Sequence, residues 1–194
     1  MKPLSERTLQ ELWELFPIIL REHNPAYAQW YRQQAQQLLA GMTAAGIGVF
    51  RISHIGSTAV PGLTAKPIVD ILLELENPGD PAVLDGVLHN AGFLRMSATE
   101  HPHWQRSYNK GYTPAGFAQK VFHLHLRRAG DWGELYFRDY LLEHGDCCRE
   151  YEALKAGLLG RFEHDRDGYT QAKTQFVERY TQLARNLYGK RYLP

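Results

Sequence analysis

Three side chains have the types and spacing needed for chemistry on a phosphate compound. Asp70 lies inside the apolar run from Pro67 to Leu72, where an ionised carboxylate is costly to bury without a cation or hydrogen bonds. His123 and His125 alternate with apolar residues, so a strand would place both imidazoles on one face. If the two strands are neighbours, these groups can hold Zn, Mn or another transition metal. The alternative is a pair of hydrogen-bonded histidines on a partly exposed strand.

Gly56 and Ser57 follow an expected strand and precede the strand that carries Asp70. Such a turn exposes backbone N–H groups, and glycine admits the close approach of a phosphate. A Gly-Ser turn without a ligand is common, but the acid in the next strand favours a binding role. Basic residues near this turn and in the following loop could neutralise phosphate oxygens; the first choices are Lys66 and Arg106, followed by Arg51, Lys110 and Arg127.

Two further residues have weaker claims. Glu74 shares a strand face with Asp70 but lies about 13 Å further along the strand, so it is a weak candidate as a metal ligand. His54 precedes the Gly-Ser turn and is expected either to support the site or to cap the loop.

Hydrophobic periodicity predicts the elements that must position these residues. We expect helices over 5–20 (capped by Ser5 and stopped by Pro17), 27–45, 83–92, 135–144, 149–162 and 170–188, and strands over 49–55, 68–75 and 121–127, with further strands and a loop over 93–116. These elements predict one domain over 1–194, comprising N-terminal helices (1–46), a core (47–130) and C-terminal helices (131–194).

Bulk composition excludes several classes of function. The 22 basic and 21 acidic residues nearly cancel, so nucleic acid and anionic membranes are not indicated as main partners. No apolar run approaches the roughly 20 residues of a membrane-spanning helix, and the N-terminus does not look like a signal peptide. Adjacent Cys147 and Cys148 are expected to be reduced structural thiols. We therefore expect a soluble, cytoplasmic protein.

Several motifs together resemble the GrpB family. The strongest are the segment His54 to Leu63 and the segment Ala65 to Ile71; later blocks in the same order are His123 to His125, Phe137 to Leu141, Tyr151 to Lys155 and Tyr169 to Lys173. GrpB proteins are similar in fold to the nucleotidyltransferase superfamily. The resemblance therefore implies an α+β fold, in which a nucleotidyltransferase-like mixed sheet is flanked by helices and holds a nucleoside triphosphate and a divalent metal (Mg, Mn or Zn).

The same resemblance suggests roles for individual residues. Gly56, Ser57 and Thr58 would bind the phosphates, and Asp70 would bind the metal. The position of the superfamily's second carboxylate holds Leu72, and Ser53 stands where many GrpB-like sequences have Glu. His123 and His125 are then expected to supply the missing ligands or to act as acid/base groups.

Our first hypothesis is a metal-dependent nucleotidyltransferase-like protein that transfers a nucleotidyl group to an unknown small-molecule or macromolecular acceptor. Its expected catalytic and metal-binding residues are Asp70, His123 and His125; its expected substrate-binding residues are Gly56, Ser57, Thr58, Lys66, Arg106, Lys110 and Arg138. For Arg138, the alternative to a role in the pocket is a surface pair with Asp139. Lys155 and Lys173 could meet the phosphate, and the alternative is that they are ordinary exposed lysines. The rival functions are nucleotide or phosphometabolite binding without chemistry, which Leu72 favours, and, third, metal-dependent hydrolysis.

Overall fold

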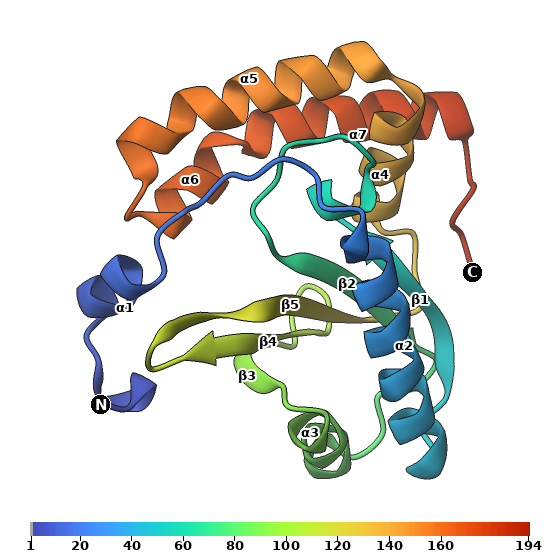
Figure 1. Ribbon diagram of the computed structural model, residues 1–194. Helices are drawn as coiled ribbons and strands as arrows, with labels where there is room; N and C mark the ends of the chain where they lie inside the picture. Colours follow the sequence, from blue (N-terminus) through green and yellow to red (C-terminus); the bar gives the residue numbers. More distant parts are fainter. Residues whose placement is uncertain (1) are drawn as a thin grey trace.

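A mixed five-stranded sheet runs through the middle of the computed structural model, which describes residues 2–194 (Figure 1). The strands are β1 (Val49–Ile55), β2 (Val69–Leu75), β3 (Leu94–Thr99), β4 (Gln105–Thr113) and β5 (Gly116–Arg128), in the spatial order β1-β2-β5-β4-β3. Only the β2–β5 pair among them is parallel. The α+β class and the mixed sheet predicted from the sequence are confirmed.

The parallel pair at the centre of the sheet brings the candidate residues together. Asp70 is in register with His123, and Leu72 with His125. Because side chains alternate along a strand, both histidines and Asp70 lie on one face. The other face of β2 carries Val69 and residues at alternate positions after it, all fully buried.

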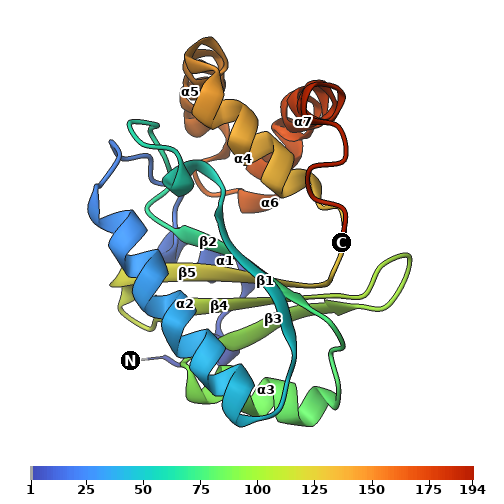
Figure 2. The same cartoon turned by 90° about the vertical axis from the view of Figure 1, so that its right-hand side faces the viewer.

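Helices cover the two faces of the sheet unequally (Figure 2). On one face, α2 (Ala26–Ala44) and α3 (Pro81–Asn90) contribute to the main apolar core with the alternate residues of β2 and β5. On the other face lie α4 (Gly133–Glu143), α5 (Gly145–Phe162), α6 (Arg166–Ala172) and α7 (Thr174–Tyr188). A smaller cluster of Ile55, Leu72 and Leu135 joins α4 to this second face. Asp70 and the two histidines therefore face the C-terminal helices.

The N-terminal helix differs from its predicted bounds. Ser5 lies in a 3-10 turn over Leu4–Glu6, and α1 spans Leu9–Leu15 with Thr8 as its cap. The Thr8 hydroxyl accepts from the Glu11 N–H at 3.2 Å, and the Glu11 carboxylate accepts from the Thr8 N–H at 2.6 Å. This reciprocal capping box satisfies two backbone donors, so the helix starts at Thr8 rather than Ser5.

The last predicted helix is two helices. The segment predicted as 170–188 is interrupted at Lys173, which ends α6 and precedes α7. α6 begins earlier than predicted because the Asp165 side chain accepts from the Gly168 N–H at 2.8 Å and caps it. This break places Lys173 beside the candidate site.

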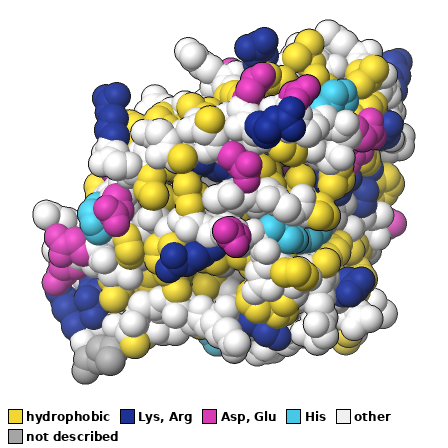
Figure 3. Space-filling view, turned by 45° about the horizontal axis from the view of Figure 1, so that its top comes forward, with side chains coloured by type: hydrophobic (Ala, Val, Ile, Leu, Met, Phe, Trp, Pro, Cys, Tyr) yellow, Lys and Arg dark blue, Asp and Glu magenta, His cyan; other side chains and the backbone are white. Residues whose placement is uncertain are grey.

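The surface carries charges of both signs. Figure 3 shows Lys and Arg side chains interspersed with Asp, Glu and apolar groups on the face drawn, in keeping with the near balance of charges in the sequence. Among the described helices, none has the length and apolar character needed to cross a membrane.

Candidate functional site

A cavity of about 950 Å³ lies beside Asp70 and the two histidines. Its walls come from the Gly-Ser turn, β2, β3, β4, β5, α5, α6 and the N-terminal segment. Figure 1 shows α1, α6 and the β4–β5 hairpin around this region. Cavities of this size bind small ligands in many proteins, so its lining residues are candidates for ligand binding.

Asp70 is held by both histidines. Its Oδ1 atom lies 3.4 Å from His123 Nδ1 and 3.6 Å from His125 Nε2. Burial by itself would raise the pKa of the Asp70 carboxyl, but the contacts with His123 and His125 outweigh it and hold that pKa well below its ordinary value. Burial lowers the pKa of His123, although Asp70 acts in the opposite direction. At neutral pH the site therefore contains an ionised carboxylate beside a neutral His123.

A hydrogen-bonded chain reaches His123 from the opposite side. Arg166 donates to the Tyr112 hydroxyl oxygen at 2.7 Å, and that hydroxyl lies 2.7 Å from His123 Nε2. The rings of Tyr112 and His123 are stacked, with centroids 5.9 Å apart. When the Tyr112 hydroxyl donates to Nε2, the proton of the neutral imidazole lies on Nδ1 and faces Asp70. Tyr112 and Arg166 thus orient a histidine that the sequence singled out.

The Gly-Ser turn lies directly against Asp70. Gly56 has φ +69°, and a Cβ atom there would come within 2.5 Å of Asp70 Oδ2. Ser57 and Thr58 form a short 3-10 helix over Ser57–Ala59. The buried Thr58 hydroxyl donates to the Ile68 carbonyl at 3.1 Å, so Thr58 holds the loop to the start of β2. All three residues, Gly56, Ser57 and Thr58, line the cavity.

His54 caps this loop from the other side of the sheet. Its Nε2 atom lies 3.0 Å from the Thr58 hydroxyl, and its ring stacks on Tyr31 of α2. Burial, aided by the charge of Arg138, lowers the pKa of His54 to about 4, against the opposing effect of Asp70. Of the two roles expected for His54, the structure places it in the second.

Four of the cationic side chains that line the cavity come from the segment before β2 and from the C-terminal helices and their junctions: Lys66, Lys155, Arg166 and Lys173. The ammonium groups of Lys66 and Lys173 lie 5.7 Å and 4.5 Å from the centre of the same Tyr169 ring. That of Lys155 lies 4.7 Å from the centre of the Tyr151 ring and donates to Ser57 Oγ at 3.4 Å and to the Thr64 carbonyl. None of the four forms an ion pair within 4 Å with a carboxylate of the described residues.

The lysines destabilise one another's charged forms. Burial, aided by the neighbouring charges of Lys66 and Lys155, lowers the pKa of Lys173 to about 7. Burial also lowers the pKa of Lys155 to about 8, and Lys66 acts in the same direction. The pKa of Lys66 is lowered by burial and by Arg166. An anion in the cavity would relieve this cost, because it would interact favourably with all of these groups.

The described residues hold no group of three or more His, Cys, Asp or Glu side chains in a metal-binding arrangement. A carboxylate and two imidazoles are suitable donor types for a divalent cation, but here they contact one another. Leu72, at the expected position of a second carboxylate, is fully buried between β1 and α4. Asp70 is the carboxylate that a cation beside the two histidines would contact, whereas Asp167, the other carboxylate on the cavity wall, is exposed in the first turn of α6.

Three charged residues considered in the sequence are engaged elsewhere. Glu74 is fully buried and binds Arg51 through two hydrogen bonds, of 2.5 Å and 2.8 Å. It is therefore the partner of Arg51 rather than a ligand beside Asp70. Arg127 lies near Glu134, at 3.5 Å, and over the Trp132 ring.

Arg106 and Lys110 direct their charges away from Asp70. Arg106 is 7% exposed, pairs with Glu100 and lies over the Trp104 ring, and it is absent from the cavity wall. Lys110 borders the cavity, but its ammonium donates to Gln34 at 2.7 Å and to the Ala91 carbonyl at 2.8 Å. Strand alternation explains both corrections, because Arg106 and Lys110 share the face of Tyr108, which belongs to the main core.

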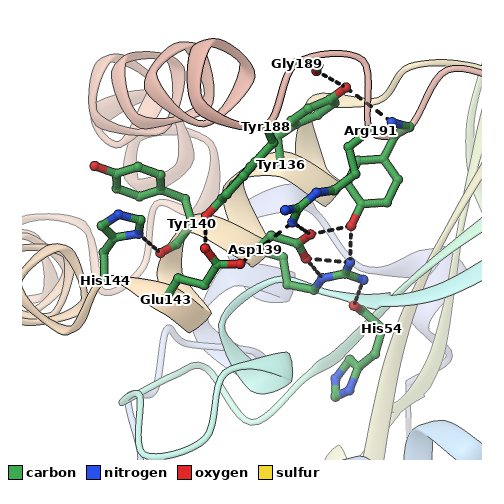
Figure 4. Close-up of polar contacts among 11 residues, drawn as sticks. His54, Tyr136, Asp139, Tyr140, Glu143, His144, Tyr188, Gly189 and Arg191 are labelled. Carbon is green, nitrogen blue, oxygen red and sulfur yellow. Dashed lines mark hydrogen bonds and ion pairs between the residues drawn. The ribbon is translucent and has the colours of Figure 1, made fainter.

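Arg138 connects α4 to β1 and, through the Tyr192 hydroxyl, to the C-terminal segment. Figure 4 shows His54, Asp139 and Arg191 of this network. Arg138 donates to the His54 carbonyl at 3.1 Å and to Asp139 at 2.7 Å and 2.9 Å. Asp139 also accepts from Arg191, at 2.9 Å, and from Tyr192. Arg138 does not line the cavity, so its position matches pairing with Asp139 and not the expected binding role.

These observations define an α+β protein with a cationic cavity against one face of its mixed sheet. The GrpB protein family model matches residues 17–183, and the chain belongs to the GrpB family. It is 38% identical to a UPF0157 protein of Pseudomonas aeruginosa over 80% of this chain and 63% of that protein. The chain thus matches less than two thirds of that relative's length.

Two further comparisons agree on the family. A glutamate-rich protein GrpB of Alkalihalophilus pseudofirmus is 31% identical over 83% of this chain and 92% of its own. The crystal structure of conserved protein GrpB from Enterococcus faecalis superposes with a TM-score of 0.74 at 26% identity, covering 88% of this chain and 99% of that one. The predicted family is therefore confirmed.

Proposed function

We propose that the cavity binds a nucleoside triphosphate and that the protein transfers its nucleotidyl group to an acceptor. The observation that carries this proposal is the convergence of Lys66, Lys155, Arg166 and Lys173, without carboxylate partners, opposite Asp70. Clustered buried cations bind polyanions strongly, since a phosphate chain offers many acceptor oxygens in a site partly shielded from water.

In the proposed complex, the four cationic side chains bind the phosphate oxygens. Gly56 allows the triphosphate to approach Asp70. A divalent cation (Mg or Mn) would neutralise phosphate charge there, with Asp70 as its protein ligand and phosphate oxygens and water as the others. A softer cation such as Zn would favour the two imidazoles. His123, oriented by Tyr112, keeps the Asp70 carboxylate in place.

The proposed reaction is a substitution at the α-phosphorus. The acceptor oxygen or nitrogen bonds to that phosphorus while the bond to the bridging oxygen breaks, and pyrophosphate leaves with the electron pair. The acceptor proton passes to an imidazole nitrogen of His125, which lines the cavity beside Asp70. Positioning and charge neutralisation account for most of the catalysis in such reactions.

Binding without turnover is the second candidate. It is supported by Leu72, which is fully buried where a second carboxylate would be needed, and by Glu74, which is occupied by Arg51. A metal-dependent hydrolase is the third possibility from the sequence; it would use the same Asp70, His123 and His125 of the cavity, with water in place of the acceptor.

Pyrophosphate release from each common nucleoside triphosphate, with Mg or Mn and a mixture of small hydroxyl and amine compounds, tests the first function. Activity that is lost in Asp70→Asn supports transfer. Asp70-dependent binding with no release on any substrate supports the second function instead. Release of inorganic phosphate in place of pyrophosphate would indicate hydrolysis.

Lys173→Met tests the binding site itself. The Lys173 ammonium forms no hydrogen bond with the described residues, and its charge is opposed by Lys66 and Lys155. The variant should therefore be at least as stable as the wild type while binding inorganic tripolyphosphate about tenfold to one-hundredfold more weakly, as for loss of a charged hydrogen bond. Calorimetric titration measures the affinity, and urea unfolding measures the stability.

Lys120→Met is the matched control. Lys120 is exposed on β5 beside Gln33 and Trp30 and does not line the cavity. Its replacement should leave the tripolyphosphate affinity unchanged. Equal affinities for the wild type, Lys173→Met and Lys120→Met would contradict the proposed site.

A further inference from the structure

The part of the cavity away from Asp70 has a different chemistry. Its walls are apolar side chains from the N-terminal segment and from β3, namely Leu4, Leu9, Leu12, Trp13, Phe16, Leu94 and Met96. Leu9 is 59% exposed, Leu94 54% and Met96 61%. Single exposed apolar residues are ordinary on protein surfaces, but these three come from two distant segments and border one cavity. Such a grouping is typical of a binding surface.

Tyr112 joins this apolar part to the cationic part. On one side its hydroxyl accepts from Arg166 and contacts His123. On the other side its ring makes edge contacts with Phe16, at 4.8 Å between centroids, and with Phe117, at 5.2 Å. A molecule lying along the apolar wall and ending at Tyr112 would therefore place its end beside His123 and Asp70.

Two charged side chains near the apolar wall are already engaged. Arg95 pairs with Asp85, and the Lys110 ammonium bonds to Gln34 and the Ala91 carbonyl. The polar groups left on this wall are few, with Asn109 and Ser5 the principal ones. A sugar, an acidic molecule or the hydrogen-bonding edge of a nucleobase would find little to bind. An aliphatic chain would bury the exposed surfaces of Leu9, Leu94 and Met96.

We propose that the apolar part of the cavity is the acceptor subsite, and that the acceptor has an aliphatic chain ending in a hydroxyl or amine. The role of the bound molecule as an acceptor rests on the proposed transfer function. The apolar subsite itself rests only on the side chains of the apolar wall. The triphosphate occupies the cationic part, and the two ligands meet at Tyr112.

Straight-chain primary alcohols of four, six and eight carbons are the probes. In calorimetric titrations with the full chain, affinity should rise up to about fourfold for each added methylene, the limit for complete burial. Met96→Ser and Leu9→Ser should weaken binding of the eight-carbon alcohol and flatten the chain-length dependence. Both variants should keep the wild-type affinity for tripolyphosphate, because their side chains lie away from the cations.

Leu187→Ser is the matched control, since Leu187 is 60% exposed on α7 and does not line the cavity. It should change neither affinity. An absence of chain-length dependence in the wild type would overturn the subsite. If Met96→Ser weakened ATP binding but not tripolyphosphate binding, the wall would hold the nucleobase, and the acceptor assignment would be wrong. If alcohols bound as expected but tripolyphosphate did not bind, the proposed function would fail while the apolar subsite stood.

Discussion

Gly56 and Asp70 lie so close together that a larger residue at position 56 would collide with the Asp70 carboxylate. The Asp70 carboxylate lies where a side chain at position 56 would begin. Two requirements, a positive φ and close approach, thus coincide at one glycine. The glycine that the sequence associated with phosphate binding also provides room for the carboxylate.

Gly56→Ala should therefore cost more stability than backbone strain alone. Alanine in the backbone conformation of Gly56, with φ +69° and ψ −175°, costs about 1–3 kcal/mol, and overpacking against Asp70 adds about 1–3 kcal/mol. Displacement of the carboxylate should also abolish any metal-dependent activity. Gly46→Ala is the control for strain, because Gly46 has φ +68° and a Cβ there would meet nothing within 4 Å. Urea unfolding that gave equal losses for both variants would show that the Gly56–Asp70 contact is unimportant.

His54 should make folding sensitive to mild acid. Its pKa falls from an ordinary 6.5 to about 4 in the folded chain, so the unfolded chain binds the proton more readily. Stability is then complete above pH 6.5 and decreases as the pH falls toward 4, by about 3 kcal/mol at most. His54→Gln retains a hydrogen-bonding group for Thr58 but cannot titrate. The difference in unfolding free energy between the two proteins should change with pH across this window and be constant above it.

At the scale of elements, the Arg51–Glu74 pair connects β1, β2 and the chain after β5. Glu74 is fully buried, and Arg51 also donates to the Gly130 carbonyl at 3.0 Å and the Tyr192 carbonyl at 3.3 Å. Gly130 donates its N–H to Glu74 at 3.2 Å. The pair thus fixes the entry to α4 and the C-terminal segment against the sheet.

Arg51→Ala should destabilise the protein by about 3–5 kcal/mol, because it leaves a buried carboxylate without its cation. The double variant Arg51→Leu, Glu74→Leu should recover much of that loss, since no charge is then buried unpaired. Arg149→Ala is the exposed comparison: Arg149 and Asp146 pair with 74% and 85% of their side chains exposed, and its loss should stay within about 0.5 kcal/mol. Chemical denaturation of all the variants distinguishes a buried pair from a peripheral one.

The sequence predicted the central elements better than the terminal ones. β1 and β2 were recognisable because β-branched and apolar residues predominate in both strands, although polar residues interrupt each of them. α1 was misplaced because Ser5 and Thr8 are both good caps, and only Thr8 has Glu three residues later. The interruption at Lys173 carries no proline or glycine, so periodicity across it looked continuous.

At the scale of the whole molecule, the cavity is assembled from segments far apart in the chain. Asp70, His123 and His125 were predictable because strand alternation is a local property. Tyr112 and Arg166 were missed as site residues, because their meeting with His123 depends on how α6 packs over the β4–β5 hairpin, which no local signal encodes. Arg106 was predicted to bind phosphate because it was expected near a loop. It lies instead on the face of β4 that points away from Asp70.

A polyanion in the cavity should couple these segments. Lys66 precedes β2, Lys155 belongs to α5, Arg166 begins α6 and Lys173 separates α6 from α7. Tripolyphosphate should therefore slow amide hydrogen exchange in α5 and α6 and raise the Tm by mass action. Exchange in α3 should be slowed less, because α3 lies on the opposite face of the sheet and does not contact the ligand. Slowing that was no greater in α5 and α6 than in α3 would contradict direct binding to these two helices.

The lowered pKa values of Lys155 and Lys173 have a consequence for the energetics of any anionic ligand. Near pH 7 to 8 a fraction of these amines is uncharged, and an arriving phosphate chain raises their pKa values. Binding should then draw protons from the buffer, so the apparent enthalpy in calorimetry should vary linearly with the ionisation enthalpy of the buffer. The slope should diminish in Lys173→Met and vanish at pH 5.5, where both amines are already protonated. Binding of an anionic ligand would thus be accompanied by a measurable uptake of protons by the protein.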